Sequence, residues 1–250
     1  MAPTVAPRKL GNMLRLSFAT GTEPGKWFTR YREYTSHELA TADADDALAD
    51  VLAGSADLAL ARVPEAGDPR IDDTFHMVRL YDEVPGIAVP KDHILAEMGE
   101  TVNPADVADE IVNYRIPDTG VVDVQAVRDA LQIVAANVGI VVAPRPLLKV
   151  LSKRQVVPLA LADAPSAPSP RTFIALVWRK EDDGEVIQDF VGIARGRTPN
   201  SSRTDTKKKS ARAKSLAKQA RRTGAVKGKK SVSKQTLSKR KKGSQRGKRR

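Results

Sequence analysis

The sequence has no cysteine, three histidines and few aromatic residues. The absence of cysteine excludes disulfides and thiol catalysis and suits a reducing compartment. His37, His76 and His93 have no carboxylates at the close spacing of known zinc motifs, so we expect no metal site and no cofactor. No apolar run is long enough to span a bilayer, and the N-terminus lacks the apolar stretch of a signal peptide, so we expect no membrane partner.

Charge is divided sharply along the chain. The formal net charge is +12, yet residues 195–250 hold 23 Lys or Arg and a single acid, Asp205. The residues before them carry a net charge of −10. A basic arm on an acidic body is typical of a protein that binds a polyanion.

This division predicts three parts. Residues 1–12 form a flexible N-terminus, residues 13–195 an α/β body, and residues 196–250 a tail that is disordered when free. The tail has almost no large apolar side chains, so burial cannot offset the entropy lost on ordering.

The body has the pattern of an α/β fold. Residues 14–19 alternate as a strand does, residues 57–61 are a short apolar run, and the first 62 residues read strand, helix, strand, helix, strand. We expect Thr20–Gly25 to form a turn with an N-cap, and Asp43 or Asp45 to cap the second helix. Further strands are predicted at 75–81, 86–89, 111–114, 140–144, 156–161 and 172–178, with helices at 103–110, 123–137 and 185–195.

Five stretches, in order, resemble the effector-binding domain of LysR-type transcriptional regulators. They include an opening strand with a small polar turn, a helix, glycine and strand ending DLALAR, and a later helix, glycine, strand and proline. The stretches are residues 14–22, 46–62, 81–96, 133–148 and 173–180.

The resemblance implies a type 2 periplasmic-binding-protein fold, in which two α/β lobes are joined by two crossovers around a small-ligand cleft. Family members bind effectors at the carboxyl ends of strands and at helix N-termini, which suits an anionic ligand. Mapped onto this chain, the cleft wall would be Thr20, Gly21 and Thr22, with Arg62 nearby. The family also implies a homodimer.

Two departures from the family are expected. The family's N-terminal winged helix-turn-helix has no counterpart before the first predicted strand. Nineteen residues separate Tyr114 from Val134, where the family places a further strand and helix, so the second lobe should be shortened.

Other candidate residues point to structure more than to chemistry. The stretch GTEPGKW, residues 21–27, departs from a Walker loop, and no nucleophile elbow, dinucleotide fingerprint or kinase signature occurs, so we expect no enzyme. The acidic clusters at 45–46 and 181–183 adjoin predicted helix starts. Arg145 follows a predicted strand, where an anionic ligand or solvent would meet it. Trp27, Phe28 and Tyr31 suit a core or a dimer surface.

The tail is predicted to bind nucleic acid through its cations. Small residues separate the Lys and Arg side chains, and without aromatic residues binding should depend on counterion release and show little sequence preference. The predicted contacts are Lys207, Lys208, Lys209, Arg212, Lys214, Lys218, Arg221, Arg222, Lys227, Lys229, Lys230, Lys234, Lys239, Arg240, Lys241, Lys242, Arg246, Lys248, Arg249 and Arg250.

The favoured function is a non-enzymatic, cytoplasmic regulatory protein of transcription, associated with the nucleoid or the ribosome, whose tail binds DNA. An RNA- or ribosome-associated protein that uses the body for docking is an alternative, because such tails are common on proteins within structured RNA. A stand-alone binder of a small ligand is a weaker one. In that case the tail would only regulate access to the cleft. Two further interpretations of the tail are that it folds onto the acidic body or that it binds acidic lipid headgroups.

Overall fold

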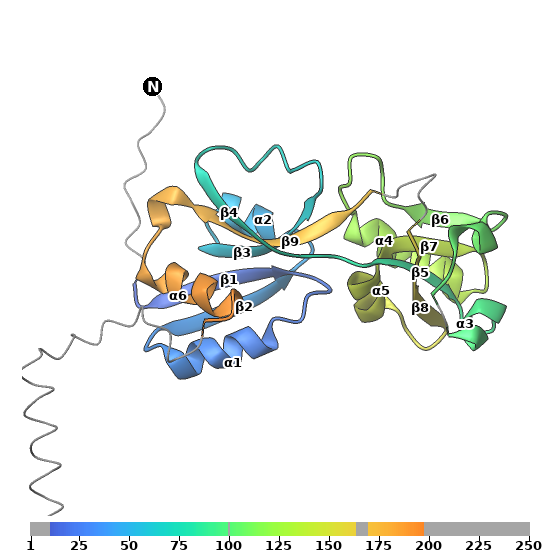
Figure 1. Cartoon of the computed structure of the whole chain (residues 1–250), viewed down its shortest axis with the longest axis horizontal. Helices are drawn as coiled ribbons and strands as arrows, with labels where there is room; N and C mark the ends of the chain where they lie inside the picture. Colours follow the sequence, from blue (N-terminus) through green and yellow to red (C-terminus); the bar gives the residue numbers. More distant parts are fainter. Residues whose placement is uncertain (1–10, 100, 164–169, 198–250) are drawn as a thin grey trace, which may run out of the picture. The chain divides into compact units, whose positions relative to one another are not determined.

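The computed structural model describes residues 11–99, 101–163 and 170–197. These residues lie within one compact unit, Met1–Pro199, whereas the second unit, Asn200–Arg250, contains no described residue. The described strands form a five-stranded and a four-stranded sheet, each with its own helices (Figure 1). We call the five-stranded sheet with its helices the first lobe and the four-stranded sheet with its helices the second lobe.

The first lobe has the strand order β2-β1-β3-β9-β4. β1 is parallel to β2 and β3, while β9 is antiparallel to β3 and β4. The predicted alternation of strands and helices at the start of the chain is therefore confirmed. The elements are β1 (Met13–Ala19), α1 (Gly25–Tyr34), β2 (Glu38–Ala44), α2 (Ala47–Leu52), β3 (Leu58–Pro64), β4 (Phe75–Asp82), β9 (Thr172–Arg179), η2 (Lys180–Asp182) and α6 (Glu185–Ala194).

β3 contributes side chains to the cores on both faces of the first sheet. Leu58 and Leu60 point to one face and pack in a cluster with residues of α1 and α6. Ala59, Ala61 and Val63 point to the other face and pack with residues of α2. Because alternate residues of a strand face opposite sides, one apolar run serves both cores.

The second lobe has the strand order β6-β7-β5-β8 and a core on both faces of its sheet. α4 and α5 pack on one face, while α3 and η1 contribute to the other. This lobe thus forms a two-sided core despite its short connection. Its elements are β5 (Pro85–Pro90), α3 (Ile94–Met98), η1 (Pro104–Val107), β6 (Val112–Arg115), α4 (Val124–Ala135), β7 (Ile140–Pro144), α5 (Arg145–Leu151) and β8 (Val156–Ala160).

The chain passes between the lobes twice. It leaves the first sheet after β4 to form β5, and it returns after β8 to place β9 between β3 and β4. The two-lobed fold with two crossovers is confirmed. β9 shows the return crossover, since this strand from late in the chain lies within the first sheet (Figure 1).

Several local predictions were wrong. Asp46, not Asp43 or Asp45, caps α2 by accepting a hydrogen bond from the Ala49 backbone N–H at 3.1 Å, because β2 runs on to Ala44. α1 has no side-chain cap, and Pro24 is its N-cap residue. The short helices α3 and α5 were not predicted.

Candidate ligand site at the junction of the two lobes

The predicted ligand residues lie at the edge of the first sheet where its parallel strands end. Thr20, Gly21 and Thr22 follow β1, and Arg62 lies near the end of β3. Parallel neighbours end on the same side of a sheet, so the fold brings the turn after β1 close to Arg62. The Arg62 Nη2 group donates to the backbone oxygen of Thr20 at 3.1 Å.

The two threonines are buried and engaged inside the protein. The Thr20 hydroxyl lies 2.5 Å from Asp43 Oδ1 and 3.0 Å from Asp45 Oδ1. The Thr22 hydroxyl donates to the backbone oxygen of Ala19 at 2.7 Å. Their hydroxyls hold the turn after β1 in place.

Gly21 brings the two lobes into contact. Its φ is +94°, and a Cβ built there would lie 2.7 Å from the Cα of Leu147 on α5. Only glycine allows the first-lobe turn to approach the second-lobe backbone so closely.

Arg62 is paired at the crossover between the lobes. Its Nε and Nη2 groups donate to Glu83 at 2.6 and 2.9 Å, and the Thr172 hydroxyl donates to the same carboxylate at 2.8 Å. The exposed fractions of the Arg62 and Glu83 side chains are 6% and 1%. Glu83 follows β4 and Thr172 begins β9, so this network joins β3 to both crossover segments.

A second charged pair joins the lobes near solvent. Arg128 on α4 donates to both carboxylate oxygens of Asp45 at 2.5 and 2.7 Å. Arg128 lowers the pKa of the Asp45 carboxyl below its ordinary value, because the guanidinium favours the ionised form.

Two cavities are lined by residues of both lobes, and Gly21 lines the larger one. The smaller, about 70 Å³, is lined by residues of both lobes, among them Arg62, Arg70 and Gly120. The Nη1 group of Arg62 is buried and has no hydrogen-bond partner among the described residues. A cavity of this volume admits water or a very small ion.

The larger cavity, about 310 Å³, has room for a small organic ligand. The first lobe contributes Gly21, Glu23 and Tyr81, and the second lobe contributes Arg145 and Lys149. Burial raises the pKa of the Tyr81 hydroxyl to about 12, so this phenol stays protonated near neutral pH.

The larger cavity is lined by two cationic side chains. The Arg145 Nε group is buried and has no hydrogen-bond partner among the described residues, and Lys149 supplies a second cation. Neither cavity is lined by a serine, cysteine or histidine.

Comparison with known proteins agrees with this architecture. Residues 29–117 match the model of the LysR substrate binding domain family. The body has the LysR effector-binding fold. No curated protein matches the chain.

The similar solved structures are distant in sequence. The BenM effector binding domain with its effector benzoate is 17% identical, with a TM-score of 0.54 over 76% of this chain and 92% of that chain. HinK, a LysR family transcriptional regulator from Pseudomonas aeruginosa, is 16% identical, with a TM-score of 0.52 over 73% of this chain and 68% of HinK. Full-length CbnR complexed with its target DNA is 13% identical, with a TM-score of 0.53 over 73% of this chain and 69% of CbnR. At such identities the likeness shows the fold.

The remaining candidate residues of the LysR-like body are placed as follows. Phe28 and Tyr31 pack in the first-lobe core, and Trp27 packs partly against it. The prediction of a core role is thus confirmed, while the dimer stays a prediction. Asp183 accepts hydrogen bonds from Trp178 and Gln188 near the start of α6. Every predicted nucleic-acid contact, Lys207 to Arg250, lies outside the described residues.

Sequence reasoning missed Glu83, Asp45 and Arg128 as residues that join the lobes. The partners in these pairs are far apart along the chain, and no motif signals them. One available signal was the acid at position 83 between two apolar strands, since a buried carboxylate needs a cationic partner.

Proposed function

We propose that this chain is a regulator of transcription whose LysR-like body binds a small anionic ligand and whose basic tail binds nucleic acid, with DNA favoured. The division of charge carries the second part. Residues 195–250 hold 23 Lys or Arg against one acid, while the residues before them carry a net charge of −10. We place this activity in the cytoplasm, on the nucleoid.

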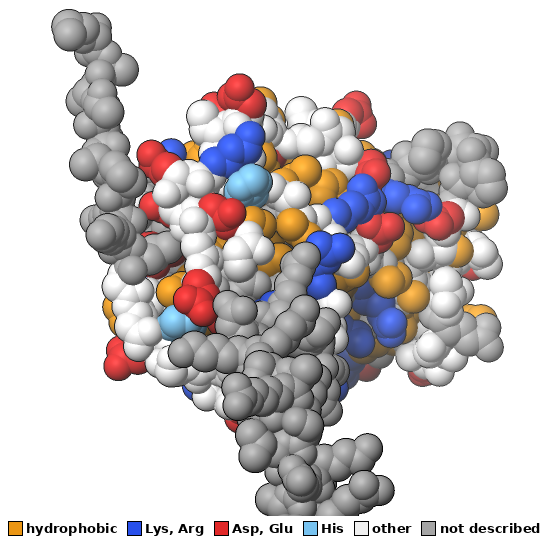
Figure 2. All heavy atoms as spheres, turned by 60° about the vertical axis from the view of Figure 1, so that its left-hand side comes forward, with side chains coloured by type: hydrophobic (Ala, Val, Ile, Leu, Met, Phe, Trp, Pro, Cys, Tyr) orange, Lys and Arg blue, Asp and Glu red, His pale blue; other side chains and the backbone are white. Residues whose placement is uncertain are grey.

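The surface of the body supports the assignment of nucleic-acid binding to the tail. On the part of the face in Figure 2 that is not drawn grey, acidic side chains occur among the basic ones. A duplex presents a continuous track of phosphates, which favours a continuous series of cations. The tail provides such a series, so truncation at residue 196 should remove most of the affinity for nucleic acid.

Truncation tests whether the tail binds nucleic acid, and a comparison of DNA with RNA shows which of the two it prefers. The full chain and residues 1–196 are each titrated into labelled duplex DNA and into a structured RNA. The proposal predicts binding by the full chain, with DNA preferred, and loss of binding on truncation. A clear preference for RNA would instead favour the ribosome-associated alternative, and equal binding by both proteins would overturn the role of the tail.

The larger cavity supports the ligand-binding part of the proposal. Arg145 and Lys149 give it two cations against the single acid Glu23, and its volume of about 310 Å³ suits a small carboxylate. Benzoate is a suitable first probe, because it is the effector in the BenM domain of the same fold.

Calorimetry with benzoate and with inorganic phosphate tests this site. Lys149→Gln should weaken binding several-fold while the fold is retained, because Lys149 is exposed. Lys153→Gln is the matched control, since Lys153 is exposed and does not line the cavity. Equal binding by wild type and Lys149→Gln would place the ligand elsewhere.

A further inference from the structure

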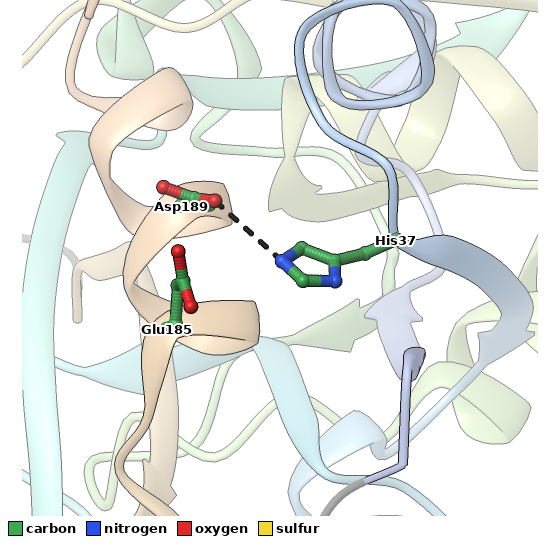
Figure 3. A group of neighbouring side chains, drawn as sticks. All are labelled: His37, Glu185 and Asp189. Carbon is green, nitrogen blue, oxygen red and sulfur yellow. Dashed lines mark ion pairs between the residues drawn. The ribbon is translucent and has the colours of Figure 1, made fainter. Parts of the chain in front are cut away.

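Three side chains of types that can bind metals meet on the first lobe, away from the junction. His37 lies just before β2, and Glu185 and Asp189 lie on α6. One ligand atom from each lies within 4.8 Å of the others. Figure 3 shows the imidazole of His37 facing the two carboxylates. No sequence motif indicates this group, because α6 lies far along the chain from His37.

The imidazole of His37 is oriented by a neighbour outside the group. Its Nδ1 atom lies 2.6 Å from Asn12 Oδ1. The amide of Asn12 is itself oriented, because its Nδ2 group donates to the backbone oxygen of Ser36 at 3.0 Å. Since Oδ1 can only accept, Nδ1 of His37 carries the proton. In the neutral ring the lone pair therefore lies on Nε2, which faces Asp189 Oδ2 at 3.8 Å.

The carboxylate of Asp189 is oriented in the same way. Its Oδ1 atom accepts a hydrogen bond from Arg197 Nη1 at 2.8 Å, which leaves Oδ2 toward His37. Such outer contacts hold the side chains that bind metals. Glu185 lies one turn earlier, at the i, i+4 spacing that places two acids on one helix face and makes them repel. A cation between them would remove this repulsion.

We propose that His37 Nε2, Glu185 and Asp189 bind a divalent transition-metal ion of the Zn²⁺ type. One imidazole with two carboxylates suits Zn²⁺ and its neighbours, whereas Ca²⁺ and Mg²⁺ favour oxygen ligands alone. Three protein ligands around tetrahedral Zn²⁺ leave one position for water. At bond lengths of about 2.0 Å the ligand atoms must approach to roughly 3.3 Å, so binding requires rotation of these side chains.

The proposed ion would join the start of β2 to α6, the helix from which the chain continues into the tail. This binding site goes beyond the proposed function and needs neither a ligand at the lobe junction nor nucleic acid. The tail adds no competing site of this kind, because it contains no histidine or cysteine and a single acid.

Calorimetric titration of the chelator-treated full chain with ZnCl₂ tests the site. The expected result is saturable binding of a single ion per chain. His37→Gln, Glu185→Gln and Asp189→Asn should each weaken binding by tenfold or more, and Asn12→Ala should weaken it by about tenfold through the orientation of His37. Zinc should also raise the unfolding temperature of the wild type and not that of His37→Gln.

Two other histidines provide matched controls. His76 lies 3.9 Å from Asp183, and His93 lies 3.1 Å from Glu110, so each has one acidic partner. His76→Gln and His93→Gln should bind zinc as the wild type does. Circular dichroism without metal checks that every variant is folded. Absence of saturable binding, or equal affinity of wild type and His37→Gln, would overturn the site.

Discussion

Glu83 accepts two hydrogen bonds from the guanidinium of Arg62 at a position where both side chains are almost fully buried. The Thr172 hydroxyl donates to the same carboxylate. The pair therefore stabilises the segment through which the chain passes between the lobes. Arg62 was predicted from the sequence to lie near a ligand, and the structure shows that its guanidinium pairs with Glu83 inside the protein.

Removal of one partner from this pair should be strongly destabilising. Glu83→Gln keeps the shape of the side chain but leaves the Arg62 charge buried without compensation, and we expect a loss of about 3–5 kcal/mol in the free energy of unfolding. Denaturant unfolding followed by circular dichroism measures it.

The Arg79–Glu65 pair is the matched control for Glu83→Gln, because it has similar geometry and is exposed. Glu65→Gln should cost less than about 1 kcal/mol. If both substitutions cost the same small amount, the Arg62–Glu83 pair has no special role at the crossover.

Gly21→Ala should separate the lobes or destabilise them. The new methyl group would lie 2.7 Å from the Leu147 Cα, which is backbone and cannot rotate away. Gly67→Ala is the control, since Gly67 has a φ of +90° and nothing lies within 4 Å of its position.

Gly67→Ala should show the conformational cost alone, about 1–2 kcal/mol. Gly21→Ala should cost more, and small-angle scattering should show a larger radius of gyration for this variant alone. Identical unfolding energies and radii for the two variants would show that the lobes do not meet at Gly21.

The Asp45–Arg128 pair should make a small contribution to stability that depends on pH. Hydrogen bonding to Arg128 lowers the pKa of Asp45 in the folded protein below its unfolded value of about 3.8. Because the pKa of Asp45 is lower in the folded protein than in the unfolded one, its ionised carboxylate stabilises the fold above the unfolded pKa. This stabilisation is lost as the pH falls through the folded pKa.

Asp45→Asn therefore tests this pair. It should lower the free energy of unfolding by less than about 1 kcal/mol at neutral pH, because both side chains are partly exposed. The difference from wild type should shrink below about pH 4. Thermal melts from pH 7 to 3 check this, and a difference that stays constant with pH would contradict it.

Much of the fold was predictable because local patterns carry it. The alternation in β1 and the apolar run of β3 indicated the first strands, and Gly139 indicated a boundary between α4 and β7, although α4 ends earlier, at Ala135. The position of β9 between β3 and β4 cannot be read from local pattern, since its partners lie more than ninety residues earlier. The family resemblance, and not periodicity, implied the two crossovers.

The sites were less predictable, because pairs that are distant in sequence form them. Strand ends correctly pointed to the edge that holds Thr20 and Arg62, since this follows from parallel pairing. The sequence could not show that Glu83 neutralises Arg62, or that α6 brings two carboxylates to His37. Such contacts depend on how the helices and strands pack.

The tail leads to the most general prediction. Its cations are separated by small residues and accompanied by no aromatic side chain. Binding should therefore vary steeply with salt and little with base sequence. If about half of the cations meet phosphates, log K should fall with log[salt] at a slope of roughly −7 to −9.

The salt dependence of duplex DNA binding, measured by fluorescence anisotropy for the full chain and for residues 1–196, tests the central claim most directly. The account predicts a steep slope for the full chain, little change between unrelated DNA sequences of equal length, and no measurable binding by residues 1–196. Binding that survives truncation, or a full chain whose affinity barely responds to salt, would contradict it.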